Sequence, residues 1–116
     1  MHLFKLDSMK GGWFIGDFEP SVMQTKDFAV GWRQHAKGEP IEPYFHVLAP
    51  EVNVIVRGRV RVNDQELAVG DIFLVHPKEV CRIEFLEDTD LVVVKWPSVP
   101  GDEYPEDVRN YGRVTV

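Results

Sequence analysis

His46 and Glu51 are the residues of this chain whose types and spacing best suit metal or acid–base chemistry. Imidazole nitrogens and carboxylate oxygens together bind mid-row divalent metals such as zinc, iron, manganese and nickel. Tyr44 stands two positions before His46, so in an extended segment the two side chains point to the same side. A phenol with a pKa of about 10 is a poor ligand for a divalent ion at neutral pH. The segment therefore offers two good donors, whereas a catalytic metal site usually has at least three protein ligands.

A third metal ligand would have to come from another strand, and His35 is the candidate. His35 stands two residues after Arg33, and alternate residues of a strand point to the same side, so both side chains would lie on one face of an expected strand. The competing interpretation of His35 is a histidine that faces solvent or bonds to a neighbouring side chain. A metal-free route is also open, because a histidine titrates near neutral pH and a tyrosine hydroxyl can donate or accept a proton. His46 and Tyr44 would supply those two groups.

The elements that must position these residues are short apolar runs that alternate with polar residues, which is the pattern of β-strands. The expected strands are residues 28–34, 52–56, 59–62, 65–69, 72–75, 81–86 and 91–96. Asn63-Asp64 and Gly70-Asp71 are typical turn pairs. Pro77 ends the strand before it, because proline has no amide proton to donate to a ladder. Many short strands at this spacing indicate a closed or sandwich-like all-β fold.

The segment that contains Tyr44, His46 and Glu51 resembles a motif of the cupins, a superfamily of small barrels. The cupin motif is His-x-His, then four residues, then Glu, and a Gly after the following strand. This chain has Tyr44, His46, Glu51 and Gly58 at those positions. One of the two histidines of the motif is therefore a tyrosine here.

The second cupin motif lies about twenty residues further on and consists of Gly-Asp, a strand, Pro and a final His. Here Gly70-Asp71 and Pro77 match it, and the final position falls on Arg82. The segments 12–20 and 94–98 also resemble one subgroup of small single-domain cupins, so the resemblance covers nearly the whole chain. It implies a cupin with a degenerate metal-binding motif.

The resemblance implies an all-β cupin-type double-stranded β-helix, or jelly-roll barrel, with little helix. We expect a single domain over residues 1–116, with the barrel core at about 28–97. An N-terminal strand arm, 1–27, and an irregular C-terminal arm, 98–116, would flank it. The subgroup has no established activity, but some small cupins act on sugars or nucleotide-sugars, which implies a ligand of that kind.

An arginine at the final motif position changes what the implied site can bind. A guanidinium is permanently charged and cannot ligate a metal. An inward Arg82 would either form an ion pair with Glu51 or bind the carboxylate or phosphate of a ligand. Strand alternation places Asn53 on the face of Glu51. The implied ligand pocket consists of Tyr44, His46, Glu51, Asn53 and Arg82, and the implied metal set of His46, Glu51 and His35.

Composition and charge limit the partners. The 116 residues carry a net charge of −6, which disfavours binding to nucleic-acid phosphates. No run of apolar residues is long enough to span a bilayer, so we expect no membrane partner. Cys81 is the only cysteine, which excludes an internal disulfide and suits a reducing compartment. We therefore expect a cytoplasmic protein, and a homodimer in which N-terminal strands cover the sheet edge.

The functional prediction is a small-molecule-binding cupin whose ligand is a sugar or another small polar anion. We expect no cofactor, or at most a weakly bound divalent metal. The first alternative is a metal-dependent isomerase, epimerase or oxygenase that uses the implied metal set. The second is a structural subunit that binds another protein. Metal that stays bound through purification would favour the metal-dependent enzyme. Stabilisation of the folded protein by a ligand would favour the small-molecule-binding protein.

Overall fold

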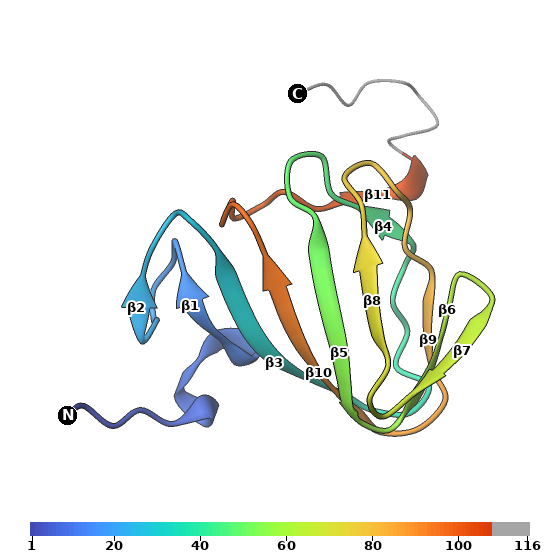
Figure 1. Cartoon of the computed structure of the whole chain (residues 1–116), viewed down its shortest axis with the longest axis horizontal. Coiled ribbons are helices and arrows are strands. Elements are labelled where there is room, and N and C mark those ends of the chain that lie inside the picture. The colour runs from blue at the N-terminus through green and yellow to red at the C-terminus, as the bar shows by residue number, and fades with distance from the viewer. Residues whose placement is uncertain (108–116) are drawn as a thin grey trace.

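The computed structural model describes residues 1–107, which fold mainly into short strands arranged as three sheets (Figure 1). The elements in chain order are η1 (Leu6–Ser8), η2 (Lys10–Gly12), β1 (Trp13–Gly16), β2 (Met23–Gln24), β3 (Ala29–His35), β4 (Tyr44–Phe45), β5 (Glu51–Arg57), β6 (Arg59–Val62), β7 (Gln65–Ala68), β8 (Ile72–Val75), β9 (Ile83–Phe85), β10 (Thr89–Lys95) and β11 (Tyr104–Pro105). The predicted all-β fold with little helix is confirmed. Within residues 1–107, no helix has the length and apolar character that a membrane span requires.

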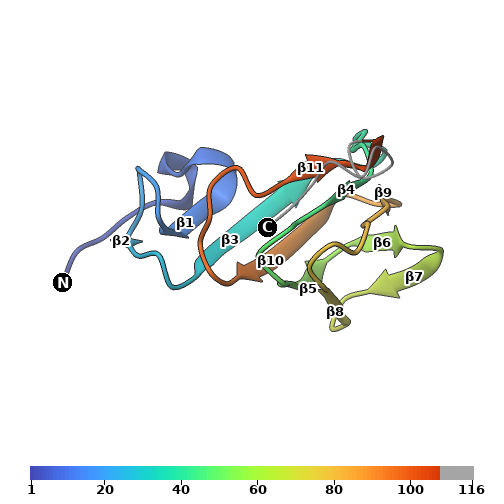
Figure 2. The same cartoon turned by 90° about the horizontal axis from the view of Figure 1, so that it is seen from above.

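The largest sheet has the strand order β2-β1-β3-β10-β5-β8. Its central strands β3, β10 and β5 are antiparallel, and β10 pairs with both neighbours along nearly its whole length. Seen from above, this sheet lies opposite the second sheet, whose order is β7-β6-β9 (Figure 2). The two sheets enclose the barrel interior, and β4 pairs with β11 at one end of it.

The chain crosses from the six-stranded to the three-stranded sheet at Gly58, between β5 and β6. Its φ of 88° lies in the left-handed region that glycine adopts without strain. A Cβ at this position would lie 2.3 Å from the Asp88 carbonyl oxygen, so any side chain is excluded. The next turn joins β6 to β7 through Asn63 and Asp64, whose φ values are 46° and 68°. These residue types tolerate the left-handed conformation that two-residue hairpins need, and the predicted turn is confirmed.

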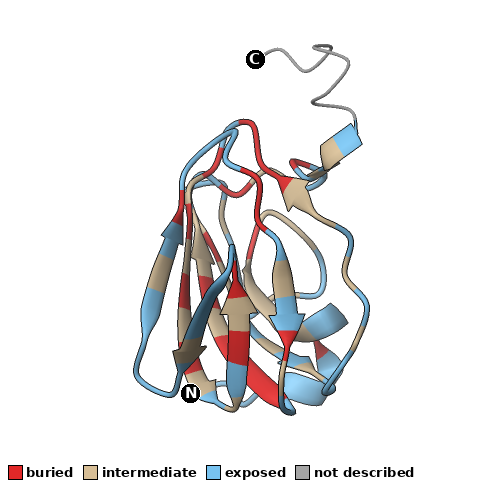
Figure 3. Cartoon of the chain, turned by 90° about the vertical axis from the view of Figure 1, so that its right-hand side faces the viewer, coloured by how far each residue is buried: buried red, intermediate tan, exposed pale blue. Residues whose placement is uncertain are grey.

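Strand alternation gives the six-stranded sheet an inner face and an outer face. In β5 the inner residues Glu51, Asn53 and Ile55 are buried, whereas the residues between them are only partly buried. Figure 3 shows such bands of buried and more exposed residues along the strands. The apolar core consists of Ile55, Val60, Val62, Val75, Cys81, Phe85, Leu91 and Val93. The inner face of this sheet therefore carries both core residues, such as Ile55, Leu91 and Val93, and the polar residues that begin β5.

Parts of both terminal segments pack against the barrel, whereas residues 1–8 are exposed. β1 and β2 extend the six-stranded sheet beyond β3, so the predicted arm 1–27 contributes strands to it. At the other end of the chain, the Asp102 carboxylate accepts hydrogen bonds of 3.0 to 3.3 Å from the backbone amides of residues 47–49. β11 then pairs with β4. The first part of the predicted arm 98–116 is thereby held over the barrel, and residues 108–116 lie outside the described residues.

Candidate functional site

A cavity of about 570 Å³ opens between the inner face of the six-stranded sheet and the C-terminal arm. Small-molecule sites typically have volumes of about 300–1,000 Å³. The polar residues that line it are Arg33, His35, Glu39, Tyr44, Glu51, Asn53, Lys95, Asp102 and Glu103. Those on β3, β5 and β10 have odd numbers, because side chains on one face of a strand recur at every second residue.

Glu51 is the centre of a hydrogen-bonded cluster on the buried side of this cavity. Its Oε1 accepts hydrogen bonds from the Asn53 side-chain amide at 2.9 Å and from the Tyr44 hydroxyl at 3.3 Å. Its other oxygen lies 3.5 Å from His46 Nε2. A buried carboxylate is costly unless hydrogen bonds replace the lost water, and Asn53 and Tyr44 provide them. The structure thus brings together four of the five residues predicted to form the pocket.

His46 is 2% exposed and lies behind Tyr44 and Glu51 rather than in the cavity lining. Its ring meets the Tyr44 ring edge-on, with centroids 5.5 Å apart. Neither ring nitrogen has a hydrogen-bond partner within residues 1–107. Burial lowers the pKa of the imidazole below its ordinary value, although the Glu51 charge acts in the opposite direction. The site therefore favours a neutral imidazole beside Glu51.

Tyr44 lines the cavity, and its hydroxyl stays protonated at neutral pH. Burial, followed by the nearby Glu51 charge, raises the pKa of this phenol well above its ordinary value. The adjacent Cys81 thiol has its pKa raised to about 11, mainly by burial. Since a cysteine reacts as the thiolate, Cys81 is a packed core residue and not a nucleophile.

Trp13 forms one wall of the cavity, and two cations lie over its ring. The indole packs on Gly31, its partner across β1 and β3, where a Cβ would come within 2.8 Å of the ring. The Arg33 guanidinium carbon lies 5.6 Å and Lys95 Nζ 4.6 Å from the ring centroid, which are cation–π distances. Arg33 also donates a hydrogen bond to the Gly11 carbonyl oxygen at 2.5 Å. Neither Arg33 nor Lys95 makes an ion pair within residues 1–107. Because Arg33 is held by its hydrogen bond to Gly11, the Lys95 ammonium is the cation more available to a ligand.

His35 lines the cavity from β3 but bonds to a neighbouring acid. Its Nδ1 lies 2.6 Å from a Glu39 carboxylate oxygen, and this hydrogen bond is the main cause of the lowered pKa of Glu39. Its ring stacks on Phe85, with centroids 4.3 Å apart and planes 12° apart. The competing interpretation of His35 as a locally bonded histidine is therefore the one that the structure shows.

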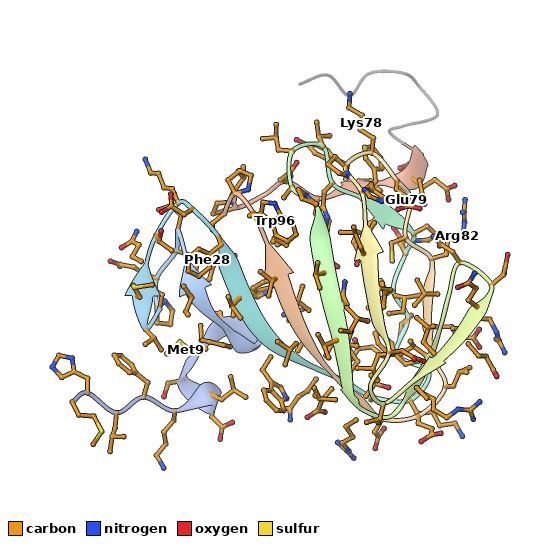
Figure 4. The ribbon with its side chains drawn as sticks, viewed as in Figure 1. Met9, Phe28, Lys78, Glu79, Arg82 and Trp96 are labelled. Carbon is orange, nitrogen blue, oxygen red and sulfur yellow. The ribbon has the colours of Figure 1, made fainter. Side chains whose placement is uncertain are left out.

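Arg82 does not point into the barrel, and the inward placement implied by the motif is wrong. Its side chain is 57% exposed and pairs with Glu106. Figure 4 shows it at the outer edge of the molecule. The backbones of Cys81 and Tyr44 exchange two hydrogen bonds that turn Cys81 inward. The backbone of Arg82 bonds instead to Asn63, and strand alternation then directs its side chain outwards.

The donors in the barrel do not fit a tightly held divalent metal. His46 and Glu51 supply two donors, and nowhere in residues 1–107 do three His, Cys, Asp or Glu side chains come close enough to hold an ion. The implied set of His46, Glu51 and His35 is therefore not assembled. Tyr44 keeps its proton. Lys95 lies near enough to help lower the pKa of His46, so its charge would also repel a metal cation.

Sequence reasoning missed Lys95 and Trp13. Lys95 could have been found from the sequence, because it follows Leu91 and Val93 at every second position of the predicted strand 91–96 and so shares their face. Trp13 had no local signal, since its position depends on the pairing with Gly31 across two strands. The arm residues at the cavity mouth depend likewise on a tertiary contact, the hydrogen bonds of the Asp102 carboxylate.

No family model and no curated protein matches this chain. Solved structures do match it. A conserved protein with a double-stranded β-helix domain from Klebsiella pneumoniae is 20% identical, with a TM-score of 0.66 and 90% of each chain covered. KdgF from Halomonas sp. is 21% identical, with a TM-score of 0.60, covering 66% of this chain and 74% of that chain. The pirin YhhW from Escherichia coli in complex with nickel(II) is 14% identical, with a TM-score of 0.60, covering 76% of this chain and 39% of that one.

Likeness at such identities concerns the fold and not the activity. The two facing sheets of this chain are consistent with the double-stranded β-helix domain named for the Klebsiella pneumoniae protein. The chain has the cupin-type double-stranded β-helix fold.

Proposed function

We propose that this protein binds a small, hydroxyl-rich molecule of sugar size in the barrel cavity. The observation that carries the proposal is the cluster of Glu51, Asn53 and Tyr44 in the lining of a cavity of about 570 Å³. A carboxylate accepts hydrogen bonds, an amide does both, and a protonated phenol donates. Sugar hydroxyls also donate and accept, so such a mixed set suits them. Trp13 adds an apolar wall.

Lys95 supports a ligand with a single anionic group, such as a sugar acid. Its ammonium lies at the Trp13 wall and makes no ion pair within residues 1–107. The lining also contains the acids Glu39, Glu51 and Glu103, which disfavour a ligand with several negative charges. Lys95 thus takes the anion-binding role that the motif assigned to Arg82.

Thermal unfolding with matched ligand pairs tests both parts of the proposal. The probes are glucuronate with glucose, and galacturonate with galactose. A ligand at a hundredfold excess over its Kd stabilises the folded state by about 2.7 kcal/mol, which raises the Tm of a small domain by several degrees. We expect Asn53→Leu to reduce this stabilisation for every member of the panel that binds. Absence of any stabilisation across a panel extended to other sugars and sugar acids would contradict the proposal.

Two cation-removing variants distinguish a ligand contact from a general charge effect. Lys95→Met removes the cation at the cavity wall, and Arg82→Met removes one from the outside of the barrel. We expect Lys95→Met to weaken the acid member of each pair about tenfold or more and to spare the neutral member. Arg82→Met is the control and leaves both unchanged. Equal effects of the two variants would contradict the role of Lys95.

A second candidate is metal-free acid–base catalysis on such a ligand, favoured by the contact between the Tyr44 hydroxyl and Glu51. The carboxylate would accept a proton from the ligand, and the phenol would donate one. Incubation of a bound ligand in heavy water, followed by nuclear magnetic resonance, detects exchange of a carbon-bound proton. Glu51→Gln should stop exchange while binding persists. If the ligand binds but none of its carbon-bound protons exchanges, the acid–base candidate is contradicted and binding alone stands as the proposed function.

Metal analysis tests the remaining enzyme alternative, a metal-dependent isomerase or oxygenase. The protein is purified without a tag, chelator or added metal, and its zinc, iron, manganese and nickel are measured by mass spectrometry. Two donors and a nearby ammonium lead us to expect far less than one equivalent of each metal. Near-stoichiometric metal that His46→Ala removes would contradict this expectation.

A further inference from the structure

The outer face of the six-stranded sheet carries an apolar grid that the ligand site does not use. The ladder registers place its side chains in two rows across four neighbouring strands. The first row is Trp32, Val92, Val54 and Ile72, and the second is Val30, Val94, Val52 and Leu74. We call these eight residues the outer grid. None of them is charged, although the chain as a whole carries a net charge of −6.

The outer grid is in contact with solvent. Ile72 is 65% exposed, Leu74 46% and Trp32 38%, and the five valines are partly exposed. Beyond Trp32 the apolar surface continues into a hollow of about 290 Å³ that is shared with Phe14 and the N-terminal segment. Contiguous apolar surface of this extent on a protein usually marks a binding surface.

We infer that a second copy of this chain covers the outer grid, so that two six-stranded sheets pack face to face in a homodimer. Strands lie about 4.8 Å apart and residues about 3.3 Å apart along them, so the four strands that carry the outer grid span roughly 400 Å². Two such faces bury on the order of 800 Å², and a specific interface should bury at least about 1,000 Å² in total. Side chains that stand up from the sheet, and the hollow beside Trp32, add to this area.

The charges at the border of the grid also favour a second copy. Asp90 accepts a hydrogen bond from the Trp32 indole at 2.9 Å and lies 3.5 Å from Arg57, so its charge is compensated within the chain. An uncharged apolar face is chemically complementary to a second copy of itself, as a two-fold interface requires. It offers no charge to a basic or acidic partner. The inference is independent of the proposed ligand site, which lies on the other face of the same strands.

Sedimentation equilibrium of the full chain tests the inference. We expect a mass of twice 13.3 kDa, and dissociation only on dilution. Ile72→Lys and Leu74→Lys each place an unpaired charge in the interface and should raise the dimer dissociation constant about a hundredfold. Val69→Lys is the matched control, because Val69 is 63% exposed but lies in the turn between β7 and β8. It should sediment as the unchanged protein does.

Three outcomes would overturn the inference: a monomer at every concentration, a dimer that tolerates both grid lysines, or equal dissociation of the Val69→Lys control. Circular dichroism checks that each variant is folded. Ile72→Thr removes apolar area without adding a charge, and it should weaken the dimer in the same direction by a smaller factor. This variant decides the matter if a lysine variant fails to fold.

Discussion

The two faces of the six-stranded sheet are built from alternate residues of the same strands, yet where β5 begins their chemistry is the reverse of the common pattern. A sheet with one solvated face usually places apolar residues inward and polar residues outward. In β5 the inner residues Glu51 and Asn53 are polar and buried, whereas Val52 and Val54 beside them are apolar and outward. β6 in the opposite sheet shows the common pattern, with valines inward and arginines outward.

The two proposals made above would account for this difference, with a ligand on the inner face and a second copy of the chain on the outer face. Polar side chains on an inner face cost stability unless hydrogen bonds satisfy them, and the Glu51 cluster lines a cavity where a ligand could use its remaining capacity. Apolar side chains on an outer face gain nothing from solvent, so Ile72 and Leu74 contribute only when another surface covers them. The arginines of β6 need no partner protein, since they pair with acids such as Glu66 and Glu84 in the same chain.

The largest effect should come from the core part of the inner face. Ile55 is fully buried, so Ile55→Ala should lower the free energy of unfolding by about 3 kcal/mol. Its outward neighbour is the control: Val54→Ala should cost less than about 1 kcal/mol at protein concentrations that favour the monomer. Urea denaturation measures both. Equal losses in the dilute protein would mean that the outer face is packed within the monomer, and the comparison of faces would fail.

The polar part of the inner face should respond next. Asn53→Leu removes the 2.9 Å hydrogen bond to Glu51 and leaves a buried carboxylate oxygen with weaker compensation. We expect a loss of about 2 kcal/mol in the free energy of unfolding. Replacing both partners, as in Glu51→Met with Asn53→Leu, should restore part of this loss, because no unsatisfied charge then remains. If the double variant is less stable than Asn53→Leu alone, Glu51 itself stabilises the fold, which would contradict the view that the Glu51 cluster serves binding rather than stability.

Acid should weaken the inner face through His46. Burial lowers its pKa in the folded state, so between that value and about 6.5 the unfolded chain binds more protons. Stability contributed by the neutral imidazole is therefore present above about pH 6.5 and declines as the pH falls, by at most about 1.4 kcal/mol per pH unit. His46→Leu should flatten this part of the curve of unfolding free energy against pH.

The smallest effect should come from Arg82, on the exterior of the barrel. An exposed ion pair such as that with Glu106 stabilises a protein by no more than about 1 kcal/mol. Arg82→Ala should therefore change the free energy of unfolding by less than about 0.5 kcal/mol. Loss of one partner of a buried pair would cost about 3–5 kcal/mol. A loss of that size would indicate that Arg82 forms a buried ion pair, which would contradict its position on the exterior of the barrel.

Strand alternation predicted the place of Asn53 correctly, whereas motif position failed at Arg82. Parity placed Asn53 beside Glu51, and the structure has the two side chains bonded. Motif position implied an inward Arg82, but the residue that pairs with Tyr44 is Cys81, one position earlier. A displacement of one residue along a strand moves a side chain to the other face. A site residue assigned from a motif is therefore correct only if the strand that carries it pairs in the expected register.

The sequence by itself determined the all-β class, the turn at Asn63-Asp64 and the alternation within each strand, because these depend on residues near one another along the chain. Only the tertiary structure decided which charges meet in the cavity. Trp13 and Lys95 are far apart in sequence and meet because β1 and β10 both pair with β3. The pairing of strands decides which inner faces meet, and local sequence carries no record of that pairing.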